Sequence, residues 1–174
     1  RAGFSCSVIL TYSTLLMPTP TPKIYALLVG IDDYPAPISQ LDGCKKDVRQ
    51  IKQYLIKNYA SAPVRTISTS QQFAIENHGQ LALCVLEDRQ ATYDNIISAF
   101  RGHLQQAQAG DVVWFHFSGH GTEAYTAEEF KNKIEPNGKD QNLVCYQNDE
   151  SDGQLLIADK ELAVLLYEVA TVGG

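Results

Sequence analysis

The sequence lacks features that several common classes of protein require. Acidic residues outnumber basic ones by 20 to 14, and the net charge of −6 provides no basic surface for binding nucleic acid. No Cys-x-x-Cys pair occurs, which argues against the usual zinc and dithiol motifs. A Gly-x-Ser-x-Gly segment is also absent, which argues against a serine hydrolase of the α/β-hydrolase type. We therefore expect neither a nucleic-acid partner nor a zinc site.

An apolar run of membrane length is missing too. The run Val8–Met17 is far shorter than the roughly 20 residues that a transmembrane helix needs. A single basic residue precedes it and no small-residue cleavage site follows it, unlike a signal peptide. Met17 is the sole methionine and precedes a stiff proline-rich stretch. We interpret residues 1–22 as a leader that is non-native or flexible, and we expect a cytoplasmic protein that has no membrane partner.

Cysteine is scarce, and its four positions are widely spaced: Cys6, Cys44, Cys84 and Cys145. A chain of 174 residues is long enough to form a core without disulfides. We therefore expect free thiols in a reducing compartment. Cys84 and Cys145 lie in apolar segments and are expected to be structural.

Residues 23–174 alternate between apolar runs and amphipathic segments. Strands are expected at 23–32, 80–88, 112–118 and 142–146, with a short strand inside the irregular segment 60–79, and helices at 41–59, 93–107 and 159–170. This alternation predicts one α/β domain that has a mainly parallel sheet flanked by helices in three layers. Functional groups in such sheets lie beyond the carboxyl ends of the strands.

Several local expectations accompany this fold. Asp42 and Thr92 stand where side chains cap the first two helices. The segment 121–141 is polar and charged and is expected to form a loop. His78 and His103 are expected on the surface. His116, inside the strand 112–118, is expected to be packed and hydrogen-bonded.

The strand 112–118 ends in an unusual motif, in which His120 stands between Gly119 and Gly121. A histidine beyond a strand end can act as a general base near neutral pH. Glycine allows the backbone to approach a ligand closely, and the amide of Gly121 is placed to donate to a developing oxyanion. The alternative is a tight turn that carries an exposed histidine.

Five segments together resemble the caspase and metacaspase superfamily of cysteine peptidases. In chain order they are KIYALLVGIDDY, LDGCKKDV, LEDRQATYDNI, VVWFHFSGHGT and IADKELAVLL. They span Lys23 to about Ala170 in the order that the family has. The resemblance implies a caspase-like large-subunit domain and a cysteine endopeptidase activity.

The resemblance also implies roles for individual residues. His120 matches the catalytic histidine, and Gly121 matches the residue whose amide contributes to the oxyanion hole. Asp47 matches the metacaspase acid in the pocket for the residue before the scissile bond, and Ser118 lines that pocket. A carboxylate there implies cleavage of a protein or peptide substrate after Arg or Lys. Cys44, one helical turn before Asp47, is expected to line the same pocket.

Two of these implications have alternatives. Asp47 is otherwise a solvated helix residue near two lysines. Some metacaspases require calcium, and acidic residues follow the histidine motif at Glu135, Asp140, Asp149 and Asp152. Their spacing matches no EF-hand, and calcium needs six to eight oxygens. A solvated acidic loop is the favoured interpretation, so we expect no metal or other cofactor.

The family's nucleophile is not found among these residues. It is expected about 50 residues after the histidine, near position 170 or later, but no cysteine follows Cys145. We expect a truncated, incomplete domain whose nucleophile strand and small subunit lie in the same gene or in a second chain. The isolated chain is then inactive and poorly soluble. The alternative is a caspase-like pseudo-enzyme that acts as an interaction or scaffold domain.

Overall fold

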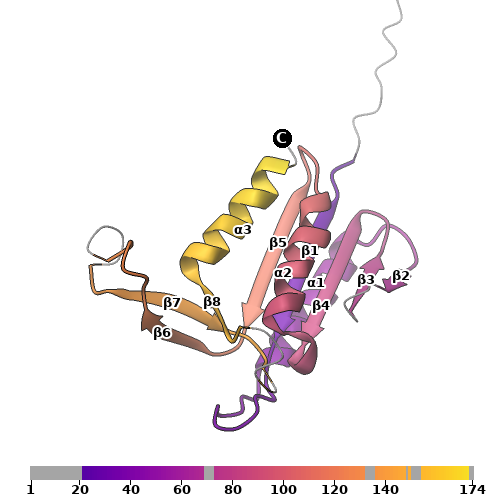
Figure 1. The fold of residues 1–174 in the computed structure, drawn as a ribbon. Helices are drawn as coiled ribbons and strands as arrows, with labels where there is room; N and C mark the ends of the chain where they lie inside the picture. Colours follow the sequence, from indigo (N-terminus) through magenta and orange to yellow (C-terminus); the bar gives the residue numbers. More distant parts are fainter. Residues whose placement is uncertain (1–20, 69–72, 132–135, 148, 150–153, 173–174) are drawn as a thin grey trace, which may run out of the picture.

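A computed structural model describes residues 21–68, 73–131, 136–147, 149 and 154–172 of the chain. These residues form two sheets and three α-helices (Figure 1). Most of the expected leader, together with Cys6, lies outside the described residues. No helix in the described ranges is long and apolar enough to cross a membrane.

The larger sheet has five strands in the order β2-β3-β4-β1-β5. Their bounds are β1 (Ile24–Gly30), β2 (Arg65–Ser68), β3 (Ala74–Asn77), β4 (Leu81–Glu87) and β5 (Val112–Ser118). β1 pairs in parallel with both β4 and β5, whereas β2 and β3 are antiparallel additions at one edge. Every residue of β1 is buried, as its unbroken apolar sequence predicts for a strand that is covered on both faces.

Helices cover both faces of this sheet, which confirms the three-layer α/β/α prediction. α1 (Cys44–Tyr59) packs Val48 and Leu55 against Ala26 and Leu28 on one face. On the other face, α2 (Tyr93–Gly102) and α3 (Asp159–Val172) close over the alternate residues of the same strands. Figure 1 shows α2 and α3 in front of the sheet and α1 behind it.

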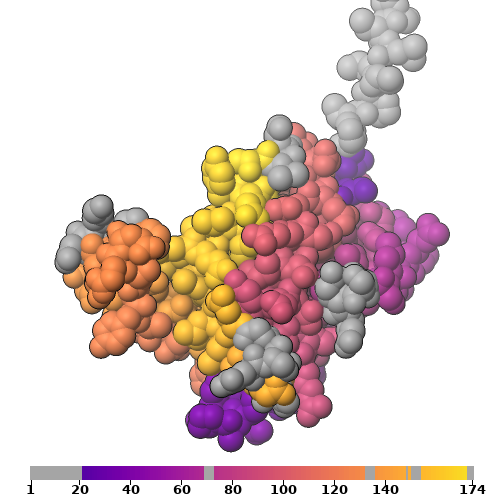
Figure 2. Space-filling model, in the orientation of Figure 1, coloured from indigo at the N-terminus to yellow at the C-terminus, as the bar shows by residue number. Residues whose placement is uncertain are grey.

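The segment 121–141 contains one whole strand and the beginning of another, so the expectation of a loop was wrong. β6 (Gly121–Tyr125), β7 (Lys139–Val144) and β8 (Leu156–Ala158) form a separate antiparallel sheet. In Figure 2 the orange β6–β7 part stands as a lobe beside the yellow α3. Most of β6 is exposed, so its residues show no alternation of apolar and polar types that a sequence pattern detects.

Other boundaries and burial predictions also differ. α2 ends at Gly102, and a short 3₁₀ turn, Leu104–Gln106, takes the place of its expected last turn. His78 and His103 are buried, not exposed as expected, at 7% and 1% exposure. His103 lies under the sheet, where its Nε2 is 3.1 Å from the carbonyl of Ala26. Tertiary packing of a helix end determines this burial, which local sequence does not reveal.

Candidate active site

The candidate site lies where the parallel strands β1 and β5 end side by side. Gly30 and Ser118 are register partners at these ends, and the amide of Ile31 donates to the carbonyl of Ser118 at 3.0 Å. His120 follows β5 and Asp32 follows β1. The expected edge of the sheet therefore carries both polar segments.

His120 is held through its backbone and its ring. Its amide donates to Oη of Tyr34 at 3.0 Å, and its carbonyl accepts from the amide of Val144 at 2.9 Å. Nε2 of the ring lies 2.7 Å from the carbonyl oxygen of Ser39. A carbonyl only accepts, so this contact places the proton on Nε2. In the neutral ring Nδ1 is then the acceptor, and no described residue hydrogen-bonds it.

Gly121 begins β6 at the edge of the small sheet, opposite Leu143 of β7. Directly opposed residues in an antiparallel ladder alternate between hydrogen-bonded and non-bonded pairs. Because the amide of Val144 bonds the carbonyl of His120, the Gly121–Leu143 pair is a non-bonded one. The Gly121 amide therefore points away from β7, as a donor to an oxyanion must.

The predicted pocket residues come together beside this turn. Asp47 lies in the first turn of α1, and Oγ of Ser118 donates to its Oδ2 at 3.3 Å. Ser118 also lies beside the thiol of Cys44 and acts to lower its pKa. Cys44 is buried, and Ser118 is half-buried. The three residues thus form one polar group between α1 and the end of β5.

His116 belongs to the same face of β5 as Ser118. It is half-buried, and burial lowers its pKa despite the nearby negative charge of Asp47. Its Nε2 is buried without a hydrogen-bond partner among the described residues, so the expectation of a hydrogen-bonded histidine fails for this atom. β5 lies at an edge of the sheet, which leaves that side of the strand without a neighbouring strand in the described sheet.

The described cysteines are free thiols and all are buried. Burial raises the pKa of Cys84 and of Cys145 to about 12, as their predicted structural role requires. Burial also raises the pKa of Cys44, and a hydrogen bond and the charge of Asp32 add to this, although the Ser118 hydrogen bond opposes it. A cysteine nucleophile needs a lowered pKa. None of these three thiols meets that requirement.

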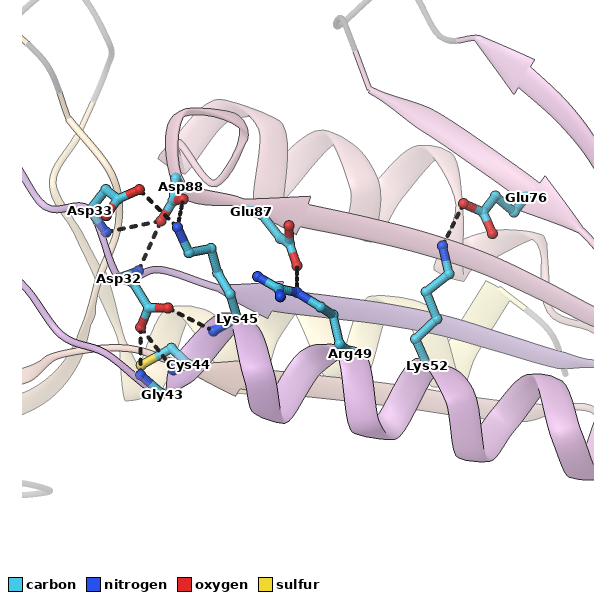
Figure 3. A network of polar contacts seen from close by, with 10 residues as sticks. All are labelled: Asp32, Asp33, Gly43, Cys44, Lys45, Arg49, Lys52, Glu76, Glu87 and Asp88. Atoms are coloured by element: carbon cyan, nitrogen blue, oxygen red, sulfur yellow. Dashed lines mark hydrogen bonds and ion pairs between the residues drawn. The ribbon is translucent and has the colours of Figure 1, made fainter.

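The start of α1 is capped from a distance, which sequence reasoning missed. Gly43 is the N-cap and gives no side-chain cap, so the prediction of Asp42 was wrong. Instead the carboxylate of Asp32 accepts from the amides of Gly43, Cys44 and Lys45 at 3.0, 2.8 and 3.2 Å (Figure 3). Burial opposes ionisation of Asp32, but these donors outweigh it and lower its pKa. Local spacing favoured Asp42, whereas β1 delivers Asp32 directly to the helix end.

A second carboxylate, Asp88, ties β4 to the same region. It accepts from the amides of Asp32 and Asp33 at 2.9 and 3.0 Å. Nζ of Lys45 lies 2.6 Å from Asp88 and 2.8 Å from Asp33. Asp88 has a φ of 46°, a conformation that non-glycine residues rarely adopt. The sequence does show carboxylates directly after two strands, Asp32 and Asp33 after β1 and Asp88 after β4. These strands are neighbours in the sheet, which the sequence alone did not reveal.

Further along α1, two more cations face carboxylates of β3 and β4. Figure 3 shows Arg49 beside Glu87 and Lys52 beside Glu76. The closest atoms are 3.7 Å apart in the first pair and 2.6 Å in the second. These pairs and Lys45 line one side of the helix, so α1 is aligned with the sheet by charge as well as by its apolar face.

The acidic residues considered for calcium do not gather in the described part of the chain. Asp140 forms an ion pair with Lys160 at 2.5 Å. Glu135 and Asp152 lie outside the described residues. Within the described ranges, no group of three or more His, Cys, Asp or Glu side chains is arranged to hold a metal ion.

Known proteins resemble this chain in both sequence and fold. Residues 25–171 match the family model described as metacaspase, peptidase C14 domain. Metacaspase-4 of Arabidopsis thaliana is 34% identical over 97 residues, which cover 56% of this chain and 20% of that protein. Metacaspase-2 of Trypanosoma brucei brucei is 31% identical over 112 residues, which cover 61% of this chain and 27% of that protein. The matched part of the chain thus spans about a fifth to a quarter of these relatives.

A solved structure shares the fold. The crystal structure of protein GSU0716 from Geobacter sulfurreducens superposes with a TM-score of 0.60 at 19% identity, covering 84% of this chain and 46% of that one. At this identity the likeness concerns the fold alone. The family match covers most of the chain and includes every residue named in the candidate site. The chain belongs to the metacaspase family of C14 cysteine peptidases.

Proposed function

We propose that this chain supplies the histidine half of a Cys–His dyad in an endopeptidase that cleaves after Arg or Lys. The observation that carries the proposal is the setting of His120. Its Nε2 is engaged by the carbonyl of Ser39, which leaves Nδ1 as the acceptor, and the neighbouring Gly121 amide points away from its ladder. A base and an oxyanion donor thus occupy consecutive residues.

The chemistry needs three protein groups. Nδ1 of His120 takes the proton of a cysteine thiol, and the thiolate attacks the scissile carbonyl carbon. The electron pair that moves onto the carbonyl oxygen is stabilised by the Gly121 amide. When the intermediate collapses, the C–N bond breaks and His120 returns its proton to the leaving amine. Water then hydrolyses the thioester and restores the thiol.

Specificity for a basic residue is assigned to Asp47 and Ser118. A carboxylate hydrogen-bonded by a serine hydroxyl presents oxygen acceptors at the end of β5, beside the histidine turn. A guanidinium group can replace the serine hydroxyl as a donor to that carboxylate and gain a charge-assisted hydrogen bond. Cys44, which is buried beside Ser118, is proposed to line the same pocket as an uncharged thiol.

The nucleophile is proposed to come from outside residues 1–174, because the family resemblance implies a cysteine after His120 in the chain and no cysteine follows Cys145. The three described cysteines are buried, and burial raises the pKa of each. The missing thiol then belongs to the remainder of the catalytic domain, in the same gene or in a second chain. On this basis the isolated chain is inactive.

Complementation tests this function. The chain is produced alone and together with any coding sequence that follows Gly174, and both are assayed with fluorogenic peptides ending in Arg, Lys or Asp. We expect Arg and Lys cleavage only in the longer protein. H120A abolishes that activity, and D47N lowers kcat/KM for Arg by about a hundredfold, the loss expected for a charge-assisted bond. D42N, which alters an exposed carboxylate just before α1, is the matched control.

Three outcomes would overturn the proposal or part of it. Hydrolysis by the isolated chain would place the nucleophile within it. Cleavage after Asp would refute the role of Asp47. A coding sequence without a cysteine in the expected strand, or a longer protein that never cleaves, would favour the alternative of a pseudo-enzyme that acts as a scaffold.

We propose further that the reaction needs no metal or other cofactor. Asp140, one of the four acidic residues considered for calcium, is already paired with Lys160. Titration calorimetry with calcium at millimolar concentration tests this, and D140N is the informative variant. Binding that is lost in D140N would instead support a calcium site.

A further inference from the structure

We propose that Tyr34 is a positioning residue for His120, with its hydroxyl inserted as a spacer into the ladder between β6 and β7. The catalytic consequence of this role rests on the proposed function, but the positioning itself does not. Tyr34 lies in the segment between β1 and α1, and it is 86 positions from the histidine that it contacts. Its side chain is 1% exposed.

The spacer follows from the register of the small sheet. Gly121 opposes Leu143, so His120 opposes Val144, one step beyond the end of β6. In a hydrogen-bonded antiparallel pair the two residues exchange two bonds. One of them is present, from the Val144 amide to the His120 carbonyl at 2.9 Å.

The hydroxyl of Tyr34 replaces the second bond. The His120 amide donates to Oη at 3.0 Å, and Oη donates onward to the Val144 carbonyl at 2.8 Å. The three residues therefore close a ring of hydrogen bonds through one side-chain oxygen. The hydroxyl separates the His120 amide from the Val144 carbonyl by one additional hydrogen bond, and neither of these two main-chain groups is left unsatisfied.

The phenol has the protonation state that this role needs. A spacer must accept one hydrogen bond and donate another, which only the neutral hydroxyl does. Burial raises the pKa of Tyr34 above its ordinary value. The hydroxyl therefore stays protonated throughout the range in which a histidine base works.

The ring of Tyr34 and the neighbouring loop complete the positioning. The Tyr34 and His120 rings lie with centroids 4.9 Å apart, at an angle of 52°. Ser39, whose carbonyl engages Nε2, belongs to the same segment between β1 and α1. One stretch of chain thus holds the backbone of His120 through Oη and its ring through a carbonyl.

This arrangement explains the glycine that precedes the histidine. A Cβ added to Gly119 would lie 2.6 Å from Oη of Tyr34 and 2.9 Å from the ring of Phe117. No side chain fits between the strand end and the hydroxyl. Gly119 is therefore required by the close approach of Tyr34, and not by an unusual backbone angle.

Removal of the hydroxyl gives a defined structural result. In Y34F the His120 amide bonds the Val144 carbonyl directly, and the ladder closes by the width of the lost oxygen. That movement draws the imidazole away from Ser39.

The experiment measures the ring ¹⁵N shifts of His120 in the chain of residues 1–174 at alkaline pH, where the imidazole is neutral, with H120A used for assignment. We expect one dominant Nε2–H tautomer in the parent. In Y34F we expect the ratio of Nε2–H to Nδ1–H to fall about tenfold, as the loss of one neutral hydrogen bond predicts.

Two further variants keep the test decisive. Y25F removes the hydroxyl of another buried tyrosine, at the opposite end of β1, and should leave the His120 shifts unchanged. G119A drives Oη away from the histidine while Tyr34 is retained, and should reproduce the tautomer mixture of Y34F. An unchanged tautomer ratio in a folded Y34F chain overturns the proposal. So does a G119A chain that is folded and has parental shifts.

A kinetic measurement tests the catalytic consequence independently of the tautomer measurement. In the longer protein that contains the nucleophile, Y34F should lower kcat by 10- to 100-fold with little change in KM, because misplacement of the base affects chemistry and not substrate binding. A longer protein that never cleaves peptides would refute the proposed function, and the tautomer measurement would still decide the role of Tyr34. A parental kcat in a folded Y34F enzyme would overturn that role.

Discussion

The amide of Cys44 lies 2.8 Å from Oδ1 of Asp32, although the two residues are 12 positions apart. This bond joins the end of β1 to the first residue of α1. Because the same helix carries Asp47, the carboxylate of Asp32 determines where the predicted pocket acid lies relative to the end of β5. The capping interaction thus connects the fold to the candidate site.

Replacement of Asp32 should therefore affect both stability and the pocket. D32A leaves three helix N-terminal amides without their acceptor, and we expect the free energy of unfolding to fall by ~2 kcal/mol. D32N retains an oxygen acceptor and should lose about half as much. Urea unfolding at neutral pH measures the loss.

Asp42 provides the control for this prediction. Asp42 is exposed, and the N-cap of α1 is Gly43, so the side chain of Asp42 does not cap the helix. D42A should change stability by less than about 0.5 kcal/mol. If D42A destabilised the chain as much as D32A does, the capping assignment would be wrong.

Gly30 controls how closely α1 approaches β1. A Cβ at this position would lie 2.7 Å from Cγ2 of Val48 and 3.1 Å from the carbonyl oxygen of Cys44. G30A must push the helix outward, and we expect a loss of about 1–3 kcal/mol in unfolding free energy. G102A, at the end of α2, is the matched control because nothing lies within 4 Å of the added carbon. It should be neutral or slightly stabilising when both variants are measured by urea unfolding.

The fold could be predicted from sequence where burial leaves a continuous apolar pattern. β1, β4 and β5 were predicted from their apolar runs, and α1 and α2 were predicted from their amphipathic spacing. The strand β6 could not be predicted because its side chains are mostly exposed. Within the site, His120 and Gly121 were predicted from local motif and resemblance. Asp32 as a cap and Tyr34 as a spacer were missed, because each acts on residues that are distant in sequence.

Because of His103, we expect the free energy of unfolding to decrease in mild acid. Burial lowers its pKa in the folded state, so the unfolded chain binds a proton more readily. The contribution of His103 to the free energy of unfolding is then fully present above the ordinary histidine pKa of about 6.5, and it is lost as the pH falls below that value. Its Nδ1 has no hydrogen-bond partner among the described residues, and the nearby backbone groups of Ala26 and Ala82 favour the protonated ring by less than burial opposes it.

The variant H103Q tests this pH dependence. Its unfolding free energy should change less between pH 7.5 and pH 5 than that of the parent, because one group that titrates differently in the two states is gone. Some dependence should remain, since burial also lowers the pKa of His116. An equal slope in H103Q and the parent would show that His103 does not contribute.

Thiol reactivity separates a structural cysteine from a nucleophile. With a pKa of about 12, Cys84 and Cys145 are thiolates in only about one molecule in ten thousand at pH 8. Iodoacetamide should leave both unmodified in the native chain, and Cys44 should react far more slowly than a free peptide thiol. Peptide mass spectrometry reads each site separately, and the urea-unfolded chain, in which all three should react, is the control. Rapid alkylation of Cys44 at neutral pH would instead mark it as an activated thiol. The nucleophile would then have to be sought on α1, and the proposal that it comes from outside residues 1–174 would fail.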